Sequence, residues 1–168
     1  MAQFPGRSPT SVAMRRIQSE LNEWLLHPPE GCRLESFEPL LNWVIMIQGP
    51  ESAPAPGLPR LYDGEVFRLA INFGDHYPLE PPEVLFIPPS PVHPHIYSNG
   101  HICLDILYDG RNGGWSPALT VNKIALSLRS MLASNTNKAR PAGDLDYCQR
   151  TRGRSPKQTN WEFDDDKV

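Results

Sequence analysis

The chain has 168 residues, of which 39% are hydrophobic and 21% are charged, and its formal net charge is -3. This length suffices for one domain with a hydrophobic core, and the composition is that of an ordinary globular protein rather than a disordered or fibrous one. The small negative charge provides no field that would attract nucleic acid or an anionic membrane, so we expect neither as a partner.

Cysteine use and the N-terminal sequence indicate the compartment. The three cysteines, Cys32, Cys103 and Cys148, form an odd, sparse set that does not resemble a disulfide framework. The first residues lack the basic and apolar regions of a signal peptide, and no apolar stretch approaches the length needed to span a membrane. We therefore expect a protein of the cytoplasm, the nucleus or both.

The first predicted element is a helix. Residues 1–10 are rich in Gly, Pro and Ser and are expected to form a flexible tail. Thr10 or Ser11 then offers an N-cap, and apolar residues recur at helical spacing until Pro28–Pro29 ends the helix. The apolar positions are Met14, Ile17, Leu21, Trp24 and Leu25.

Short strands follow the helix. Residues 43–47 carry apolar side chains on both faces, so this strand is expected to be central in a sheet. Further strands are predicted over residues 64–73 and 83–87, and the Pro-rich segment 49–60 must be a surface connection. Because no helix intervenes, the strands predict an antiparallel meander.

The rest of the chain begins with a long segment, 93–117, that has little periodicity and much His, Asn, Gly and Asp, which is typical of a functional loop. Thr120 or Asn122 can then cap a second clear helix. Its apolar positions are Val121, Ile124, Leu126, Leu128, Met131 and Leu132. We expect the domain to span residues 11–150, followed by a partly disordered tail over residues 151–168.

Cys103 lies in the long loop, and three interpretations of it compete. A lone cysteine is most often a small, buried apolar residue. Alternatively, His93, His95, His101 and Cys103 offer four zinc ligands, although their spacings are shorter than those of structural zinc sites. In the third interpretation Cys103 is a nucleophile that attacks an acyl group. The residue types alone leave all three open.

Three blocks of sequence around Cys103 resemble those of ubiquitin-conjugating enzymes. Residues 77–86 (YPLEPPEVLF) resemble the YPFxPPxVxF motif, residues 93–107 (HPHIYSNGHICLDIL) resemble the HPN…NGxICLDIL active-site block, and residues 115–119 (WSPAL) match the block that follows. The blocks occur in the family's order and at its intervals. The resemblance is closest to the W-type branch, which also has HPH in place of HPN and a late tryptophan followed by acidic residues.

The resemblance implies an α+β fold with an N-terminal helix, a four-stranded antiparallel meander, the active-site loop and C-terminal helices. A strand near residues 33–37, which periodicity does not reveal, would complete the meander. The resemblance also implies that Cys103 accepts ubiquitin as a thioester from the activating enzyme and passes it to an amine. No cofactor or metal is implied, because the upstream enzyme consumes the ATP.

The implied partners are ubiquitin, the ubiquitin-activating enzyme, ligases of RING or U-box type, and protein substrates. The family's arrangement assigns six residues to the ligase-binding surface: Arg15, Arg16, Leu79, Ser116, Pro117 and Ala118. Trp161 and Phe163 in the expected tail are candidates for recognising flexible substrates or for folding back against the domain. A non-catalytic ubiquitin-binding variant of the fold, or an enzyme for another ubiquitin-like modifier, is the alternative function.

The chain departs from the family pattern in two features that bear on which amine accepts ubiquitin. His95 replaces the asparagine credited with supporting the oxyanion or the loop, and an imidazole can serve as donor, base or packing residue. Lysine-directed members place an acid just after the helix that ends near Leu132, whereas this chain has none before Asp144. An α-amine, with a pKa of about 7.7–8.0, needs less help to lose its proton than lysine at about 10.4. These features favour N-terminal ubiquitination, which the W-type branch implies.

Two further departures from the family pattern concern Asp105 and the insertion 108–114. Asp105, a possible supporting residue, occupies a position where lysine-directed members have Asp and W-type members have Ser, which weakens the inference of N-terminal specificity. The insertion 108–114 lies beside the cysteine block and is expected to alter access of the acceptor.

Overall fold

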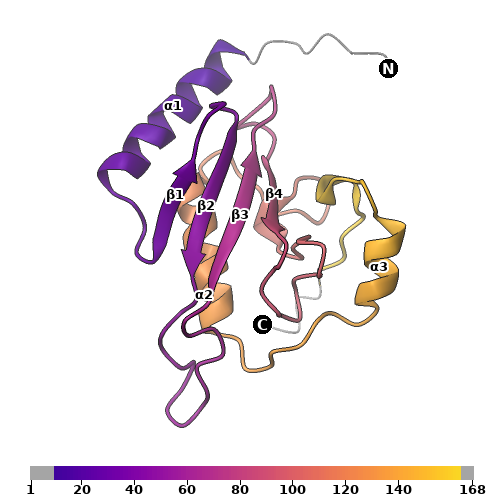
Figure 1. The fold of residues 1–168 in the computed structure, drawn as a ribbon. Coiled ribbons are helices and arrows are strands. Elements are labelled where there is room, and N and C mark those ends of the chain that lie inside the picture. The colour runs from indigo at the N-terminus through magenta and orange to yellow at the C-terminus, as the bar shows by residue number, and fades with distance from the viewer. Residues whose placement is uncertain (1–9, 164–168) are drawn as a thin grey trace.

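The computed structural model describes residues 10–163, and in this range a four-stranded sheet is combined with three α-helices (Figure 1). The predicted α+β class is confirmed. The expected flexible N-terminal tail, apart from Thr10, lies outside the described residues, as do residues 164–168 of the expected C-terminal tail.

The first helix, α1, spans Ser11–Leu26. Thr10 is its N-cap, because the Thr10 hydroxyl accepts a hydrogen bond from the Ala13 amide at 3.2 Å. The predicted apolar stripe is buried at Ile17, Leu21 and Trp24. Leu25 was predicted on the same stripe but is 59% exposed, since a residue directly after Trp24 is turned about 100° away around the helix.

The four strands are β1 (Cys32–Ser36), β2 (Asn42–Gln48), β3 (Val66–Asn72) and β4 (Glu83–Ile87). They pair antiparallel in the order β1-β2-β3-β4, so the meander and the central position of β2 are confirmed. One face of the sheet is buried along β2, β3 and β4, as the pairs Ile45–Leu69 and Leu69–Phe86 illustrate, and is half-buried along the edge strand β1.

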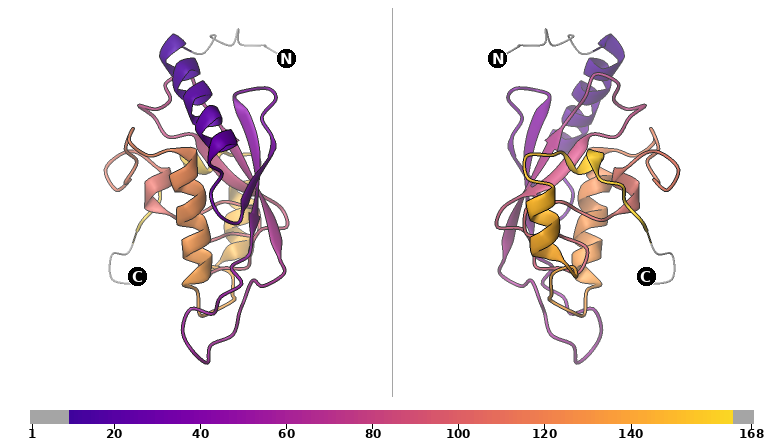
Figure 2. Two further views of the ribbon diagram at one scale, coloured as in Figure 1. Left: turned by 90° about the vertical axis from the view of Figure 1, so that its left-hand side faces the viewer. Right: turned by 90° about the vertical axis from the view of Figure 1, so that its right-hand side faces the viewer.

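Helix α2 spans Val121–Ala133, with Thr120 as its N-cap, and lies against the buried face of the sheet (Figure 2). The short helix α3, Asp144–Arg150, lies beyond the β4 edge (Figure 1). Two 3-10 turns, η1 (Asp105–Leu107) and η2 (Pro156–Gln158), complete the elements. No helix within residues 10–163 is long and apolar enough to cross a membrane.

The domain continues beyond residue 150, where the sequence placed its end. Trp161 is only 8% exposed and belongs to the main hydrophobic core. Its ring lies 5.2 Å from that of Tyr108 and 5.8 Å from that of Tyr147, measured between centroids. The described part of the expected tail, residues 151–163, therefore packs against the domain instead of forming a separate disordered segment.

Candidate functional site

Cys103 lies at the end of a small hairpin that is attached to β4. Ile96 and Ile102 pair antiparallel, and the Cys103 amide donates to the His95 carbonyl at 2.8 Å. The turn of the hairpin requires glycine, because Gly100 has a φ of +96° and a Cβ there would lie 1.9 Å from the Phe86 carbonyl oxygen. This close approach fixes the hairpin on the sheet and leaves the Cys103 side chain partly exposed at its edge.

The two histidines of the HPH block have different environments. His93 is buried, and its Nδ1 accepts the His95 amide at 2.9 Å, so the proton of the neutral ring is on Nε2. Burial, with a smaller effect of His95, lowers the pKa of His93 to about 4, against a backbone hydrogen bond to Met131 that acts in the opposite direction. His93 is thus a neutral structural residue at physiological pH.

His95 presents its ring to solvent while its backbone holds the loop. Its amide is bonded to His93, its carbonyl accepts the Cys103 amide, and its side chain is exposed. The support that His95 gives to the loop therefore comes from its backbone, and the imidazole is available to a bound substrate.

Arg140 is a residue of the site that the sequence analysis missed. Its guanidinium donates to the carbonyls of Ser90, Pro91 and Ile96 at 3.0, 2.7 and 3.2 Å, and to the Ser90 hydroxyl at 2.9 Å. These bonds hold the two ends of the segment that carries the histidines. A lone arginine in a polar stretch offers no local signal of this role, because all its partners are more than forty positions away in the chain.

The first acid after α2, Asp144, lies against the hairpin. Its carboxylate accepts the Ser98 amide at 2.8 Å, and the Cys148 thiol donates to it at 3.5 Å. Burial acts to raise the pKa of Asp144, but the bonds from Ser98 and Cys148 and the charge of Arg140 outweigh it and lower the pKa below its usual value. A carboxylate with these partners is a weak base, and it holds the hairpin.

His101 connects the hairpin to the C-terminal segment. Its Nδ1 lies 2.8 Å from the Tyr147 hydroxyl, which in turn lies 2.8 Å from the Thr159 hydroxyl. Burial lowers the pKa of His101.

Cys103 borders a groove whose opposite wall is formed by the end of α3 and the C-terminal segment. The charged side chains of Arg150, Arg154 and Glu162 lie along this wall.

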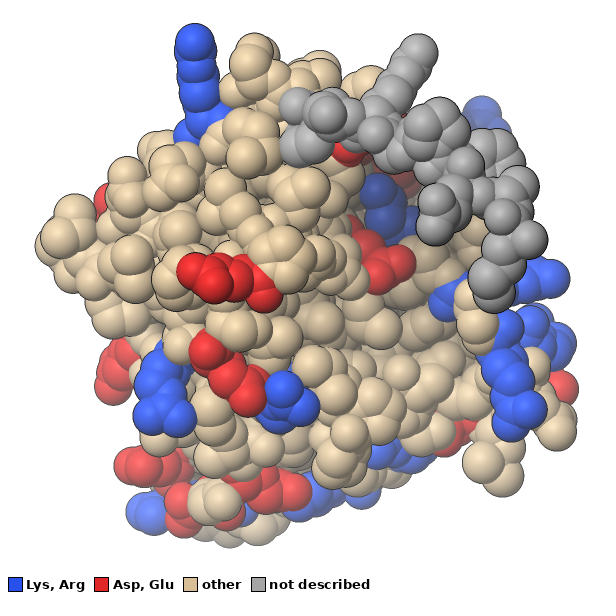
Figure 3. Space-filling view, turned by 45° about the horizontal axis from the view of Figure 1, so that its top comes forward, with Lys and Arg blue, Asp and Glu red and all other residues tan. Residues whose placement is uncertain are grey.

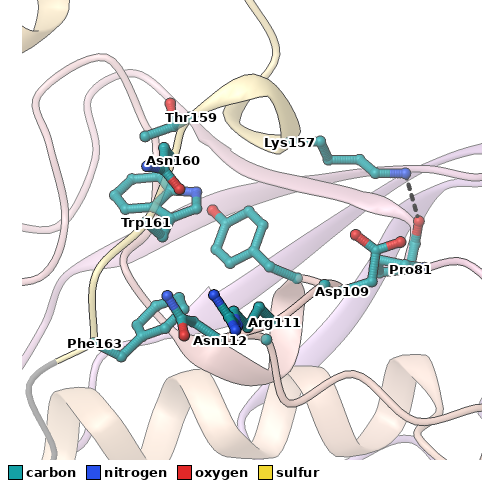
Figure 4. Close-up of a pocket in the computed structure, with 12 residues that line it drawn as sticks. Pro81, Asp109, Arg111, Asn112, Lys157, Thr159, Asn160, Trp161 and Phe163 are labelled. Carbon is teal, nitrogen blue, oxygen red and sulfur yellow. Dashed lines mark hydrogen bonds between the residues drawn. The ribbon is translucent and has the colours of Figure 1, made fainter.

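The insertion 108–114 forms one wall of a second pocket (Figure 4), which shares Trp161 with the groove beside Cys103. The pocket lies between Arg111 and Asn112 of the insertion and Phe163 of the C-terminal segment. Asp105, at the start of η1, accepts the adjacent Ile106 amide at 2.8 Å. The Asp105 carbonyl accepts the amides of Tyr108 and Gly114, at 3.1 and 2.9 Å, so its backbone joins the two ends of the insertion.

The six residues assigned to ligase binding gather at the end of the molecule where α1 begins. Leu79 is 76% exposed, and Arg15 and residues 116–118 are also exposed. Arg16 differs, because its guanidinium is turned inward onto Glu20 and the loop that follows Trp115. Brought forward in Figure 3, this end of the molecule is largely uncharged, with small, scattered groups of acidic and basic side chains.

Residues 10–163 contain no cluster of side chains that would support the zinc interpretation. In that range no three side chains of His, Cys, Asp or Glu type lie close enough together to hold a metal ion. His93 and His101 are instead engaged in the hydrogen bonds described above.

Comparison with known proteins places these features in a family. The model of the family described as ubiquitin-conjugating enzyme matches residues 16–162. Ubiquitin-conjugating enzyme 15 of Arabidopsis thaliana is 49% identical over 166 residues, which cover 98% of this chain and 96% of that protein. The probable ubiquitin-conjugating enzyme E2 W of Dictyostelium discoideum is 45% identical, and the match covers 95% of this chain and 99% of that protein.

A solved structure agrees with the sequence comparisons. The crystal structure of ubiquitin-conjugating enzyme E2 UbcA1 from Agrocybe aegerita superimposes with a TM-score of 0.75 at 37% identity. The match covers 88% of this chain and all of the other.

Proposed function

The chain belongs to the ubiquitin-conjugating enzyme family, whose members act through a cysteine thioester, and we propose that it transfers ubiquitin from Cys103 preferentially to protein N-terminal α-amino groups. The observation that carries the proposal is the position of Cys103, which is half-buried at the edge of a hairpin, bonded through its amide to the His95 carbonyl, and borders a groove.

The chemistry consists of two acyl transfers. The Cys103 thiolate attacks the thioester that joins ubiquitin to the activating enzyme, a new carbon–sulfur bond forms, and the thiol of the activating enzyme leaves. The neutral amine of a substrate then attacks the same carbonyl. The bond to Cys103 breaks, the thiolate leaves, and the proton released from the amine passes to water or to a nearby base.

The acceptor preference is supported by the surroundings of Asp144. Lysine, with a pKa of about 10.4, is roughly one part in a thousand neutral at pH 7.4 and benefits from a carboxylate that takes its proton, whereas an α-amine near pKa 7.7–8.0 is about a quarter neutral. Asp144 already accepts bonds from Ser98 and Cys148. A site with this arrangement favours the amine that is already neutral.

His95 is assigned the role of oxyanion donor. An N–H of its exposed ring can stabilise the charge that develops on the thioester oxygen, the function that asparagine has in the family pattern. If this assignment is right, His95→Ala slows single-turnover discharge by about 10²–10³-fold at saturating amine, and His95→Asn retains most of the rate. Equal rates for His95→Ala and the wild type would remove the imidazole from the mechanism.

The test of the proposed function begins with loading. The chain is incubated with activating enzyme, ATP and ubiquitin, and a reductant-sensitive adduct is expected that Cys103→Ala does not form. The alternatives, a non-catalytic ubiquitin-binding variant or an enzyme for another modifier, predict no adduct with ubiquitin. Parallel incubations with other ubiquitin-like modifiers separate these two.

The acceptor is then tested with the loaded enzyme. Discharge is followed onto free lysine, onto a lysine-free peptide with a free N-terminus, and onto the same peptide acetylated at its N-terminus as the matched control. Rapid discharge to the free peptide alone supports α-amine preference, and rapid discharge to lysine alone contradicts it.

The proposal also includes the cellular compartment and the partner proteins of the enzyme. We expect the enzyme in the cytoplasm, the nucleus or both, with the ubiquitin-activating enzyme upstream and ligases of RING or U-box type downstream. The exposed Leu79 and residues 116–118 form the proposed ligase-docking surface. Leu79→Ala is expected to weaken binding of a RING domain, as measured by calorimetry, without preventing ubiquitin loading.

A further inference from the structure

Glu20 is a buried carboxylate in the middle of α1, and three segments of the chain bond to it. Its side chain is 8% exposed and accepts the Nε–H of Arg16 at 2.9 Å, the amide of Val121 at 2.7 Å and the hydroxyl of Tyr77. A buried charge is tolerated only when its hydrogen bonds are satisfied, and here they are. Because Glu20 is buried, a docked partner has little access to it.

Tyr77 provides the second part of the arrangement. It is 2% exposed, and burial first and the neighbouring Glu20 second raise its pKa well above the usual value. The phenol therefore stays protonated and donates its hydrogen to Glu20. Tyr77 directly precedes the loop that carries the exposed Leu79, so the bond fixes the start of that loop.

Arg16 extends the arrangement to the other docking loop. While Nε is bonded to Glu20, its terminal nitrogen donates to the carbonyls of Pro117 and Leu119, each at 2.8 Å. Its guanidinium also lies 5.7 Å from the centroid of the Tyr77 ring. Only the forked, planar guanidinium can reach the carboxylate and both carbonyls at once.

The two docking loops are also joined directly. The indole N–H of Trp115 donates to the Pro78 carbonyl at 2.9 Å, and its ring lies 6.0 Å from that of Tyr77. At the far end of the second loop, the ammonium of Lys123 donates to the Ala118 carbonyl at 3.0 Å. The loops are therefore connected to each other, to α1 and to the start of α2.

We propose that Glu20 is a positioning residue for ligase docking, which holds the Leu79 loop and residues 116–119 in one relative geometry through Tyr77 and Arg16. The inference rests on the proposed function, in which these loops bind ligases. Loops held in their bound geometry before association lose less conformational freedom on binding, so the clamp contributes to affinity without touching the partner. We call the three side chains, Glu20, Tyr77 and Arg16, the α1 clamp.

The test compares two conservative variants of buried phenols. Tyr77→Phe removes the bond to Glu20, whereas Tyr62→Phe removes the hydroxyl of another tyrosine that is 2% exposed, which lies outside the clamp and bonds to Val92 and Asn135. The probe is an isolated RING domain that is titrated into each full-length variant by calorimetry. We expect Tyr77→Phe to raise the Kd about five- to tenfold and Tyr62→Phe to leave it within twofold, at similar losses of thermal stability.

Arg16→Lys separates the clamp from a direct role of the positive charge. Lysine keeps the charge but cannot bridge Glu20 and the two carbonyls, so the Kd should rise as it does for Tyr77→Phe. The double variant should show little further loss, because both changes disrupt the same clamp.

Three results overturn the inference. The first is an unchanged Kd in Tyr77→Phe, and the second is full affinity in Arg16→Lys. The third is a rise of the Kd in Tyr62→Phe equal to that in Tyr77→Phe, because the effect would then be one of general stability. Failure of the docking surface itself is recognised separately. If the wild type binds the RING domain and Leu79→Ala binds as tightly, the ligase docks elsewhere, and the proposed surface is rejected together with the clamp.

Discussion

The burial of Trp161 makes the C-terminal segment a testable part of the domain. Its indole packs against three tyrosines, the nearest of which is Tyr108, and donates its N–H to the Pro156 carbonyl at 2.9 Å. Trp161→Ala removes these contacts. A separate, disordered tail over residues 151–168 would instead predict no effect on stability.

The size of the stability loss expected for Trp161→Ala follows from the burial of this side chain and from its position within residues 151–163. Truncation of a buried tryptophan to alanine in a core costs about 3–5 kcal/mol. Local opening of a segment at the end of a domain sets an upper limit, so the loss cannot exceed the free energy with which residues 151–163 dock on the rest of the domain. We therefore expect the free energy of unfolding to fall by about 2–4 kcal/mol and the midpoint of thermal unfolding by about 5–15 °C.

The assay is urea denaturation followed by circular dichroism, combined with hydrogen exchange of residues 151–163. Trp161→Phe keeps most of the packed ring and loses the N–H bond, so it should lose about 1 kcal/mol. Glu162→Ala, an exposed neighbour, should stay within about 0.5 kcal/mol of the wild type. The reasoning is refuted if Trp161→Ala unfolds at the same denaturant concentration as Glu162→Ala.

Three further changes probe the hairpin that carries Cys103. Arg140→Met removes four hydrogen bonds to the histidine segment and should slow single-turnover discharge about tenfold or more, as followed on gels, while Arg140→Lys should recover only part of the rate. His93 has a folded-state pKa of about 4 against 6.5, so the unfolded chain binds its proton first as pH falls, and the free energy of unfolding should drop by about 3 kcal/mol between pH 6.5 and 4. His93→Asn should flatten this part of the pH profile of urea denaturation, and an unchanged profile would contradict the assignment. Gly100→Ala places a methyl group against the Phe86 carbonyl and should cost about 3 kcal/mol, which lowers the thermal midpoint by about 6–12 °C in differential scanning fluorimetry; a midpoint near that of the wild type would mean that the turn relaxes.

Local sequence determined the elements of the fold and the identity of the candidate nucleophile. The N-cap at Thr10, the stop at Pro28–Pro29 and the alternation in residues 43–47 each act over a few residues, and the predicted helices and strands are found within one or two positions of their expected ends. Cys103 was identified as the nucleophile because the motifs on both sides of it resemble those of the family, whereas the residue types alone left three interpretations open. The strand β1 needed the family resemblance, because its alternation is too weak to detect, and the short helix α3 was implied only by the C-terminal helices of that family.

Tertiary structure decided the roles of the polar residues and of the tail. Arg16 was assigned to the ligase-binding surface and bonds to a loop about a hundred positions away. Asp144 was noted only as the first acid after the helix that ends near Leu132, and it bonds to the hairpin. Trp161 was predicted either to recognise substrates or to fold back against the domain, and it lies in the core. Periodicity reports which side of an element faces the interior, since burial repeats with the turn of a helix or the pleat of a strand. It carries no information about which distant carbonyl a guanidinium reaches, because that depends on how the finished elements pack.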